Sequence, residues 1–519
     1  NVAPPVGLWM VNCDSMWRSP LSRLSYLAMS TDTRVQISAT RLIANVASHP
    51  EGRDKISDLV VGTLERLLDS SSLHIQAPAA LVVSRNRFKE WHPSTASGKR
   101  LLNTCIRLVN ASGNDNAEAR EQGVEALSVL CLKYEAKHRI LKEAVKAVCE
   151  LSTTGNEESS FWLGIANVLH ELSTSEHEKN AELGRDMDIT AEHFETLQRI
   201  NNMKKDQDVA ENLDVEARIH ERIAEMIRCG ACSALCRISS ASSKRTKETV
   251  VRTMINFCKY HPARGPLAAA GGVRVCASLA KNPYEKVSHR AMTALARMLI
   301  SVNPQMLREH QLMDAVVPLL EMSRQEQDPL MQFEASMAMT NLASFSMELK
   351  QHIVAYDGIV QFEMLQTHQN KMVRRASTEA LSNLVPCEAI FDKFKQKDGK
   401  LLDWWMQLSE EDSDFPTSRA ATGMLAMVSS DPEIANAMIA RNHVPRILKL
   451  LDDWDGEDEM AARIMAMIGN IVDCATPPGI GLKTFRKAGA VQVVKRVEVE
   501  DVNVQKSVSE ILGILEESS

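Results

Sequence analysis

The sequence predicts an all-α fold, a right-handed α-solenoid built from repeated helical units. Three observations support this prediction. Helical segments rich in small and apolar residues recur at a fixed period, glycines recur in the same register, and 519 residues are too many for one compact core. The composition is 44% hydrophobic with 25 Met but only 4% aromatic, which suits helices that pack on helices.

The period is clearest in the second half of the chain. One reference position per unit falls at residues 256, 297, 341, 383, 427 and 470, with steps of 41, 44, 42, 44 and 43. Glycines that would end a helix in a left-handed conformation recur alongside it, at Gly230, Gly272, Gly358, Gly399 and Gly489. This period is typical of armadillo repeats, whose third helix is expected to line a concave surface.

The first half is less regular. Units are expected to end near residues 44–47, 80–83, 126–129 and 165–168. We assign residues 1–108 to a first set of armadillo repeats, of central or neck type, and 109–519 to a second repeat domain. Dense charge at about 180–213 predicts a long loop that interrupts the array.

Charge and cysteine usage narrow the class of protein. The net charge of -7 argues against nucleic acid or an anionic membrane surface as a partner. No apolar run approaches the roughly 20 residues that a membrane span needs. The 11 scattered Cys are typical of a reducing, cytoplasmic location.

No catalytic constellation is recognisable. Cys229 and Cys232 form a CxxC, but no second pair or His set accompanies them, so core packing is the expected role. Ser97-Gly98-Lys99 lacks the other residues of a phosphate-binding loop, and GxSxG and HExxH are missing. We therefore expect a protein without enzymatic activity, catalytic residues, metal or cofactor.

The segment 332–344 carries the most informative pattern. Read as a helix, it has one apolar stripe for a core, formed by Ala335, Ala338, Met339, Leu342 and Phe345. A second stripe at i, i+4 and i+8 holds Phe333, Met337 and Asn341, where a surface helix usually carries charge. That stripe is either packed by a neighbour or faces a binding groove.

The same stripe can be followed through the neighbouring units. It places Arg252 with Asn256, then Arg297, and later Arg375, Glu379 and Asn383. An Asn amide both donates and accepts hydrogen bonds, so a ladder of Asn could clamp the backbone of an extended peptide. The alternative is that these Asn cap or bridge neighbouring helices. The predicted groove comprises Arg252, Asn256, Arg297, Phe333, Met337, Asn341, Arg375, Glu379 and Asn383.

Several of these segments resemble the UCS family of myosin chaperones. The similar stretches include QFEASMAMTNLAS at 332–344, RRASTEALSNLV at 374–385 and RAMTALARMLISVNP at 290–304. The resemblance implies that 109–519 is a UCS-type domain, a co-chaperone that holds the partly unfolded myosin motor domain in a concave groove. In that groove it implies roles for Phe333 and Asn341.

The resemblance also implies heat-shock protein 90 as a second partner. Animal members bind it through an N-terminal tetratricopeptide module, and this sequence shows no 34-residue repeat. We therefore expect that module to be missing here. Self-association of the repeats is left open.

The alternative function is a general armadillo-repeat adaptor that binds peptides. Nuclear-import adaptors place a Trp four residues before each ladder Asn. Here those positions hold Arg252, Met337 and Glu379, which argues against import cargo.

Overall fold

The computed structural model describes residues 20–175, 216–324, 327–396, 398–410, 414–454 and 456–516. Within these ranges the chain is α-helical with short 3₁₀ turns and no β-strand, which confirms the predicted all-α repeat fold. The predicted charged loop at about 180–213 lies outside the described residues. No helix within them combines the length and apolarity that a membrane span requires.

The chain divides into two compact units, 1–294 and 295–519, and the division falls within helix α19. It does not coincide with the predicted boundary at 108/109, which falls at the end of α7 and stays a prediction. The helices that begin in the first unit are α2 Pro20–Leu27, α3 Thr33–Ala47, α4 Pro50–Arg53, α5 Asp58–Leu67, α6 Leu73–Asn86, α7 Ala96–Val109, α8 Ala117–Leu130, α9 Tyr134–Glu143, α10 Val145–Leu151, α11 Phe161–Leu172, α14 Glu216–Arg228, α15 Ala231–Ile238, α16 Lys244–Lys259, α17 His261–Ala269, α18 Gly272–Leu279 and α19 Glu285–Leu299.

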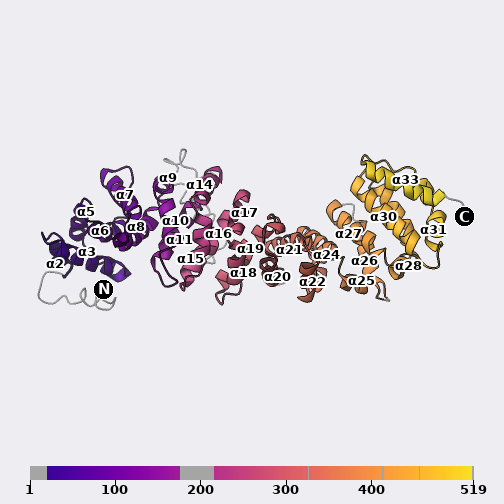
Figure 1. The fold of residues 1–519 in the computed structure, drawn as a ribbon, viewed down its shortest axis with the longest axis horizontal. Helices are drawn as coiled ribbons and strands as arrows, with labels where there is room; N and C mark the ends of the chain where they lie inside the picture. The colour runs from indigo at the N-terminus through magenta and orange to yellow at the C-terminus, as the bar shows by residue number, and fades with distance from the viewer. Residues whose placement is uncertain are drawn as a thin grey trace. The chain divides into compact units, whose positions relative to one another are not determined.

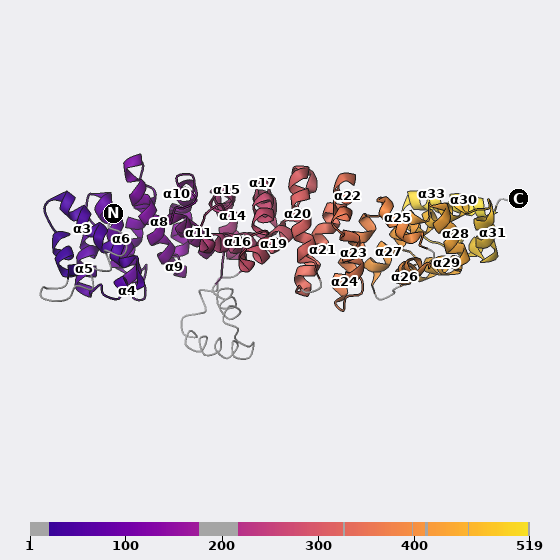
Figure 2. The same ribbon diagram turned by 90° about the horizontal axis from the view of Figure 1, so that it is seen from below.

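In the first unit, the last helix of each repeat packs on the last helix of the next. The stack runs α3, α6, α8, α11 and α16 (Figure 2). The four predicted unit ends lie on the first four of these helices. Their contact faces are rich in small side chains; in α6, Ala77, Ala79 and Ala80 are fully buried, which lets backbones approach closely. Helix α11 packs directly on α16, so the described helices before and after the predicted charged loop belong to neighbouring repeats.

The second unit continues the three-helix pattern with a short helix, a second helix and a longer third helix. Its helices are α20 Glu309–Met322, α21 Pro329–Ala343, α22 Met347–Ala355, α23 Gly358–Leu365, α24 Lys371–Asn383, α25 Glu388–Phe394, α26 Lys400–Ser409, α27 Phe415–Val428, α28 Pro432–Ala440, α29 Val444–Asp453, α30 Asp458–Cys474, α31 Ile480–Lys487, α32 Ala490–Val494 and α33 Val502–Glu516. The third helices α21, α24, α27, α30 and α33 stack in that order (Figure 1).

The predicted glycine turns are present, with one correction. Gly230, Gly399 and Gly489 have φ of 88°, 58° and 83°, the left-handed region that favours glycine. At the other two turns the left-handed residue stands one position earlier than predicted, at Gly271 and Asp357. Gly358 is required for a different reason, because a Cβ there would lie 2.7 Å from the backbone oxygen of Ile353.

Candidate functional site

Helix α21 has the two stripes that its sequence predicts. Asp328 caps its N-terminus by accepting a hydrogen bond from the Leu330 N–H at 2.8 Å, and Pro329 occupies the first turn. On the core stripe, Ala335, Ala338, Met339 and Leu342 are fully buried, whereas Phe345, just beyond the helix, is half-buried. Because the core stripe is buried, the second stripe on the other side of the helix faces the surface.

The second stripe is partly accessible. Phe333, Met337 and Asn341 are each half-buried, unlike their neighbours Ala335 and Ala338. On α24, which packs on α21, the register places Arg375, Glu379 and Asn383, also half-buried. We call these six side chains the third-helix face. An aromatic ring and a thioether therefore lie beside a polar row, which suits contact with a partner.

The amide of Asn341 is committed to the fold. Its Nδ2 donates to the backbone oxygens of Leu299 at 2.7 Å and Val302 at 3.0 Å, at the C-terminal end of α19. The last carbonyl groups of a helix have no partner inside it, so this amide caps the preceding repeat. Both N–H bonds are used, which leaves the carbonyl oxygen as the only polar atom that Asn341 could offer to a peptide.

The same bridge recurs between other repeats. Asn383 donates to the Thr340 oxygen at 2.9 Å, and Asn470 donates to the Ala426 oxygen at 2.7 Å. In the structure these Asn side chains therefore bridge neighbouring helices. This was the alternative to a ladder that clamps a peptide backbone. Each bridge is worth about 1 kcal/mol net, and an orphaned carbonyl would cost more.

Asn256 requires a correction. It is only 4% exposed, and its Nδ2 donates to Thr174 Oγ1 at 2.7 Å, just beyond the end of α11. Its Oδ1 accepts a hydrogen bond from Lys259 Nζ at 3.1 Å. Because the amide is buried and engaged at both ends, it is not available to hold a peptide.

The predicted charged residues form pairs. Arg297 Nε lies 2.8 Å from Glu334 Oε1, and both side chains are largely buried. Arg375 Nε lies 3.3 Å from Glu379 Oε1, one helical turn away. The charges of Arg375 and Glu379 cancel locally, so the third-helix face is polar but nearly neutral.

The nine predicted residues do not all come together. Seven lie in the second unit, whereas Arg252 and Asn256 lie in the first. Arg252 is half-buried on α16, and burial together with the nearby charge of Arg290 lowers its pKa. The described geometry therefore supports a candidate site on the second unit alone.

Met427 is a further candidate that is not among the nine predicted residues. It occupies the ladder position of α27, where other units carry Asn, and it is 46% exposed. Gly423, four residues earlier, adds no side chain to the same row. The 43-residue register already pointed to position 427, and the unusual residue type there was the signal that could have found it.

The CxxC spans the turn from α14 to α15: Cys229, just after α14, is partly exposed, and only Cys232 lies in the core of the first unit. Cys232 is buried on α15 and Cys236 is half-buried, and Gly230 is the left-handed residue before that helix. Burial raises the pKa of the Cys232 thiol to about 12. Across the part of the chain that the structure describes, no group of three or more His, Cys, Asp or Glu is placed to hold a metal ion.

Comparison with known proteins relates the chain to the UNC-45 proteins. No family model matches the sequence. The human protein unc-45 homolog B is 25% identical over 342 residues, which cover 64% of this chain and 35% of the relative. Ring assembly protein 3 of Schizosaccharomyces pombe is 26% identical over 299 residues, 54% of this chain and 39% of the relative. The chain thus spans between a third and two fifths of these relatives' lengths.

The fold comparison agrees. The myosin chaperone UNC-45 from C. elegans, solved in complex with an Hsp90 peptide, aligns with a TM-score of 0.74 at 20% identity, covering 96% of this chain and 52% of that one. She4p aligns with a TM-score of 0.66 at 19% identity, over 98% and 73% of the two chains. The chain is homologous to the UNC-45 proteins by sequence and shares their fold, which confirms the resemblance to the UCS family.

Proposed function

We propose that this chain is a myosin co-chaperone that binds the partly unfolded myosin motor domain and assists its folding and assembly. The observation that carries the proposal is the partly exposed pair Phe333 and Met337 on α21, beside the paired charges of α24. Homology to UNC-45 proteins, one of which is described as a myosin chaperone, supplies the choice of client. No catalytic step belongs to this proposal, and its setting is the cytoplasm.

Binding would depend mainly on apolar contact. An unfolded client exposes apolar side chains that a folded one buries, and Phe333 with Met337 can cover such a side chain. Arg375 and Glu379 would exchange part of their mutual pairing for contacts with the client. Asn341 and Asn383 set the position of the helices and can add a carbonyl oxygen as an acceptor.

Heat-shock protein 90 is the second partner that we propose. A peptide of that protein is bound in the C. elegans UNC-45 structure. We assign its recruitment to a tetratricopeptide module and not to the armadillo repeats. Self-association of the repeats stays a prediction.

A binding experiment separates this function from a general peptide adaptor. Purified chain is incubated with heat-unfolded myosin motor domain, with native motor domain and with basic signal peptides. The proposal predicts capture of the unfolded motor domain and little of the other two. Preferential binding of the basic peptides would favour the adaptor.

A further inference from the structure

Large apolar side chains are exposed at the first turns of two neighbouring third helices in the second unit. Leu330 is 56% exposed and Met372 is 45% exposed, and each is the second residue of its helix, α21 or α24. The two helices begin alike, because Asp328 accepts a hydrogen bond from the Leu330 N–H at 2.8 Å and Asn370 accepts one from the Met372 N–H at 2.9 Å. The two side chains therefore occupy equivalent positions in neighbouring repeats.

The apolar character continues into the next repeats. Phe415 is the first residue of α27, which packs on α24, and its side chain is half-buried (Figure 1). Its ring contacts that of Trp454, directly after α29, with 5.0 Å between the ring centroids. We call Leu330, Met372, Phe415 and Trp454 the N-terminal row. Exposed apolar side chains that follow one another over a surface, unlike scattered ones, mark an interaction site.

The N-terminal row borders the third-helix face. Leu330 stands three and seven residues before Phe333 and Met337, so these three side chains share one side of α21. Met372 stands three residues before Arg375 in the same way on α24. We propose that the N-terminal row belongs to the same binding site and holds an extended segment of the client that carries an apolar residue at every third position. This proposal rests on the proposed function, because it takes the unfolded motor domain as the client.

The spacing of the helices determines which extended segment fits. Helices that pack on one another have axes about 8–10 Å apart, so the side chains that α21, α24 and α27 contribute to the row are spaced at about this distance. In a polyproline II chain every third side chain lies on the same face, and a rise of about 3.1 Å per residue places these side chains about 9 Å apart. In a β-strand the side chains on one face repeat at about 6.7 Å, which is too short to place one on each helix.

The conformation that fits the row is one that an unfolded client already adopts. Polyproline II is a major conformation of unfolded chains, so the client offers this spacing without folding first. The unbranched thioether of Met372 adapts to apolar partners of different shape, and Phe415 with Trp454 provides an aromatic end to the row. Such a surface accepts many sequences as long as their apolar spacing is kept.

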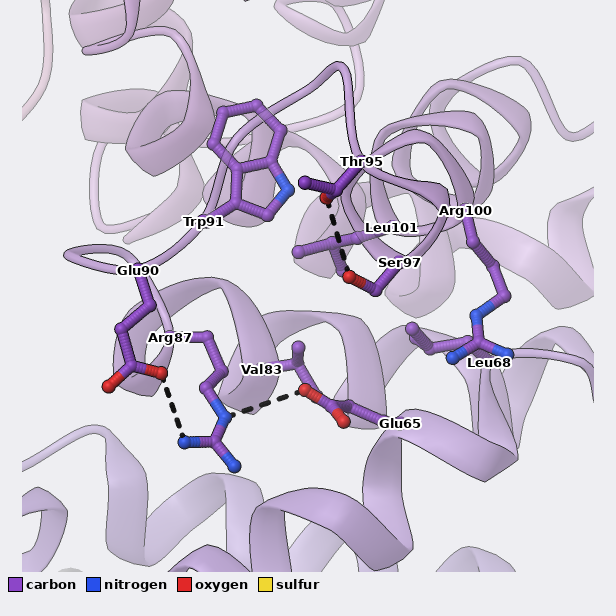
Figure 3. A pocket seen from close by; sticks show the side chains of 10 residues that line it. All are labelled: Glu65, Leu68, Val83, Arg87, Glu90, Trp91, Thr95, Ser97, Arg100 and Leu101. Atoms are coloured by element: carbon purple, nitrogen blue, oxygen red, sulfur yellow. Dashed lines mark hydrogen bonds and ion pairs between the residues drawn. The ribbon is translucent and has the colours of Figure 1, made fainter.

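A pocket of about 320 Å³ in the first unit gives no comparable site. It lies between α5, the end of α6, the connection 87–95 and the start of α7 (Figure 3). Its two arginines, Arg87 and Arg100, are both paired with carboxylates, and Figure 3 shows Arg87 joined to Glu65 and Glu90. The charges around this pocket are therefore balanced within the protein, and we assign it no ligand.

Peptides of one composition test the spacing. Three blocked, fluorescently labelled nonapeptides contain three Leu and six Ser, with the Leu at every second, every third or every fourth position. Each is titrated with the full chain, and binding is followed by fluorescence anisotropy. We expect the peptide with Leu at every third position to bind about fivefold more tightly than the other two. The proposal is overturned if this peptide shows no saturable binding or binds no better than the others.

Substitution of the row separates this proposal from the proposed function. Leu330→Ser/Met372→Ser should bind heat-unfolded motor domain about tenfold more weakly than the wild type and lose the preference among the peptides, with thermal unfolding close to that of the wild type. Met29→Ser/Leu59→Ser is the matched control, because it changes a Met and a Leu of the first unit that are 48% and 69% exposed. This control should bind like the wild type.

The outcomes distinguish the two claims. If the wild type captures the unfolded motor domain and Leu330→Ser/Met372→Ser captures it equally well, the role of the row is overturned and the proposed function stands. If the control variant weakens binding as much as the row variant, the effect is not specific to the row and the proposal is also overturned. If the wild type does not capture the unfolded motor domain, the proposed function fails, and the client assigned to the row fails with it.

Discussion

The side-chain amide of Asn341 donates both of its N–H bonds to the Leu299 and Val302 oxygens, so one residue of α21 closes the end of α19. With Asn383 and Asn470, it forms a series of bridges between consecutive third helices. This arrangement assigns the ladder Asn to the integrity of the array and leaves the neighbouring Phe333 and Met337 for a partner.

Replacement of a bridging Asn should therefore lower stability. Asn341→Ala leaves two helix-terminal carbonyls without a donor, and we expect the free energy of unfolding to fall by about 1–3 kcal/mol. Urea denaturation checks the magnitude, and hydrogen exchange should show faster opening at the end of α19. Asn436→Ala on α28, which removes two solvent-exposed hydrogen bonds to Thr476 in the connection after α30, is the control and should cost less. An Asn341→Ala chain with wild-type stability would contradict the bridge.

His443 predicts a pH dependence of stability. Its side chain is 1% exposed, and burial, with a further contribution from Arg446, lowers its pKa, although Asp403 at 3.0 Å from Nε2 opposes this. The unfolded chain therefore takes up a proton at this site at a higher pH than the folded chain does. Stability should fall as the pH drops below about 6.5, and the loss should be complete below the lowered pKa of the folded state.

Substitution identifies the group responsible. His443→Asn should flatten the stability profile in that pH range, as measured by urea denaturation at several pH values. Asp403 does not interfere, because hydrogen bonding from Arg441 lowers its pKa from 3.8, and its own contribution is lost only in stronger acid. An unchanged slope in the variant would show that another group titrates.

Three cysteines of the first unit should be unreactive in the folded protein. Burial raises the thiol pKa of Cys105 and Cys232 to about 12 and that of Cys236 to about 11, so the reactive thiolate is scarce near pH 8. We expect these three to resist alkylation by iodoacetamide until the chain is unfolded. Mass spectrometry of native and unfolded samples measures this, and rapid native labelling of Cys232 would contradict its core position.

The repeat fold could be predicted because a repeat period and a helical spacing can both be read directly from the order of residue types. Positions 41 to 44 residues apart carry similar side chains, and the core residues Ala335 and Leu342 follow from helical spacing. The use of the Asn side chains could not be read in the same way. A half-buried amide follows the same pattern whether it points to a groove or to the preceding helix, and its acceptors lie 39 and 42 residues earlier in the chain.

The same limit explains Asn256 and Met427. Asn256 has the register of the ladder, but burial against the end of α11 depends on contacts 82 and 83 residues away. That Met427 breaks the ladder can be read from the sequence, but only the three-dimensional arrangement shows that its side chain is exposed. The stripe on α21 was predictable; which of its members are free to contact a partner was not.

We propose above that Phe333 and Met337 hold unfolded myosin. The direct measurement is light scattering by heated myosin motor domain in the presence of the full chain. The double variant Phe333→Ala/Met337→Ala should lose most of the protection, because its affinity for the unfolded motor domain falls roughly thirtyfold (about 2 kcal/mol). The thermal unfolding of this variant should stay close to that of the wild type. Val360→Ala/Met364→Ala, which removes two exposed apolar side chains of α23, is the matched control and should protect fully. Wild-type protection by the Phe333→Ala/Met337→Ala chain would contradict the account.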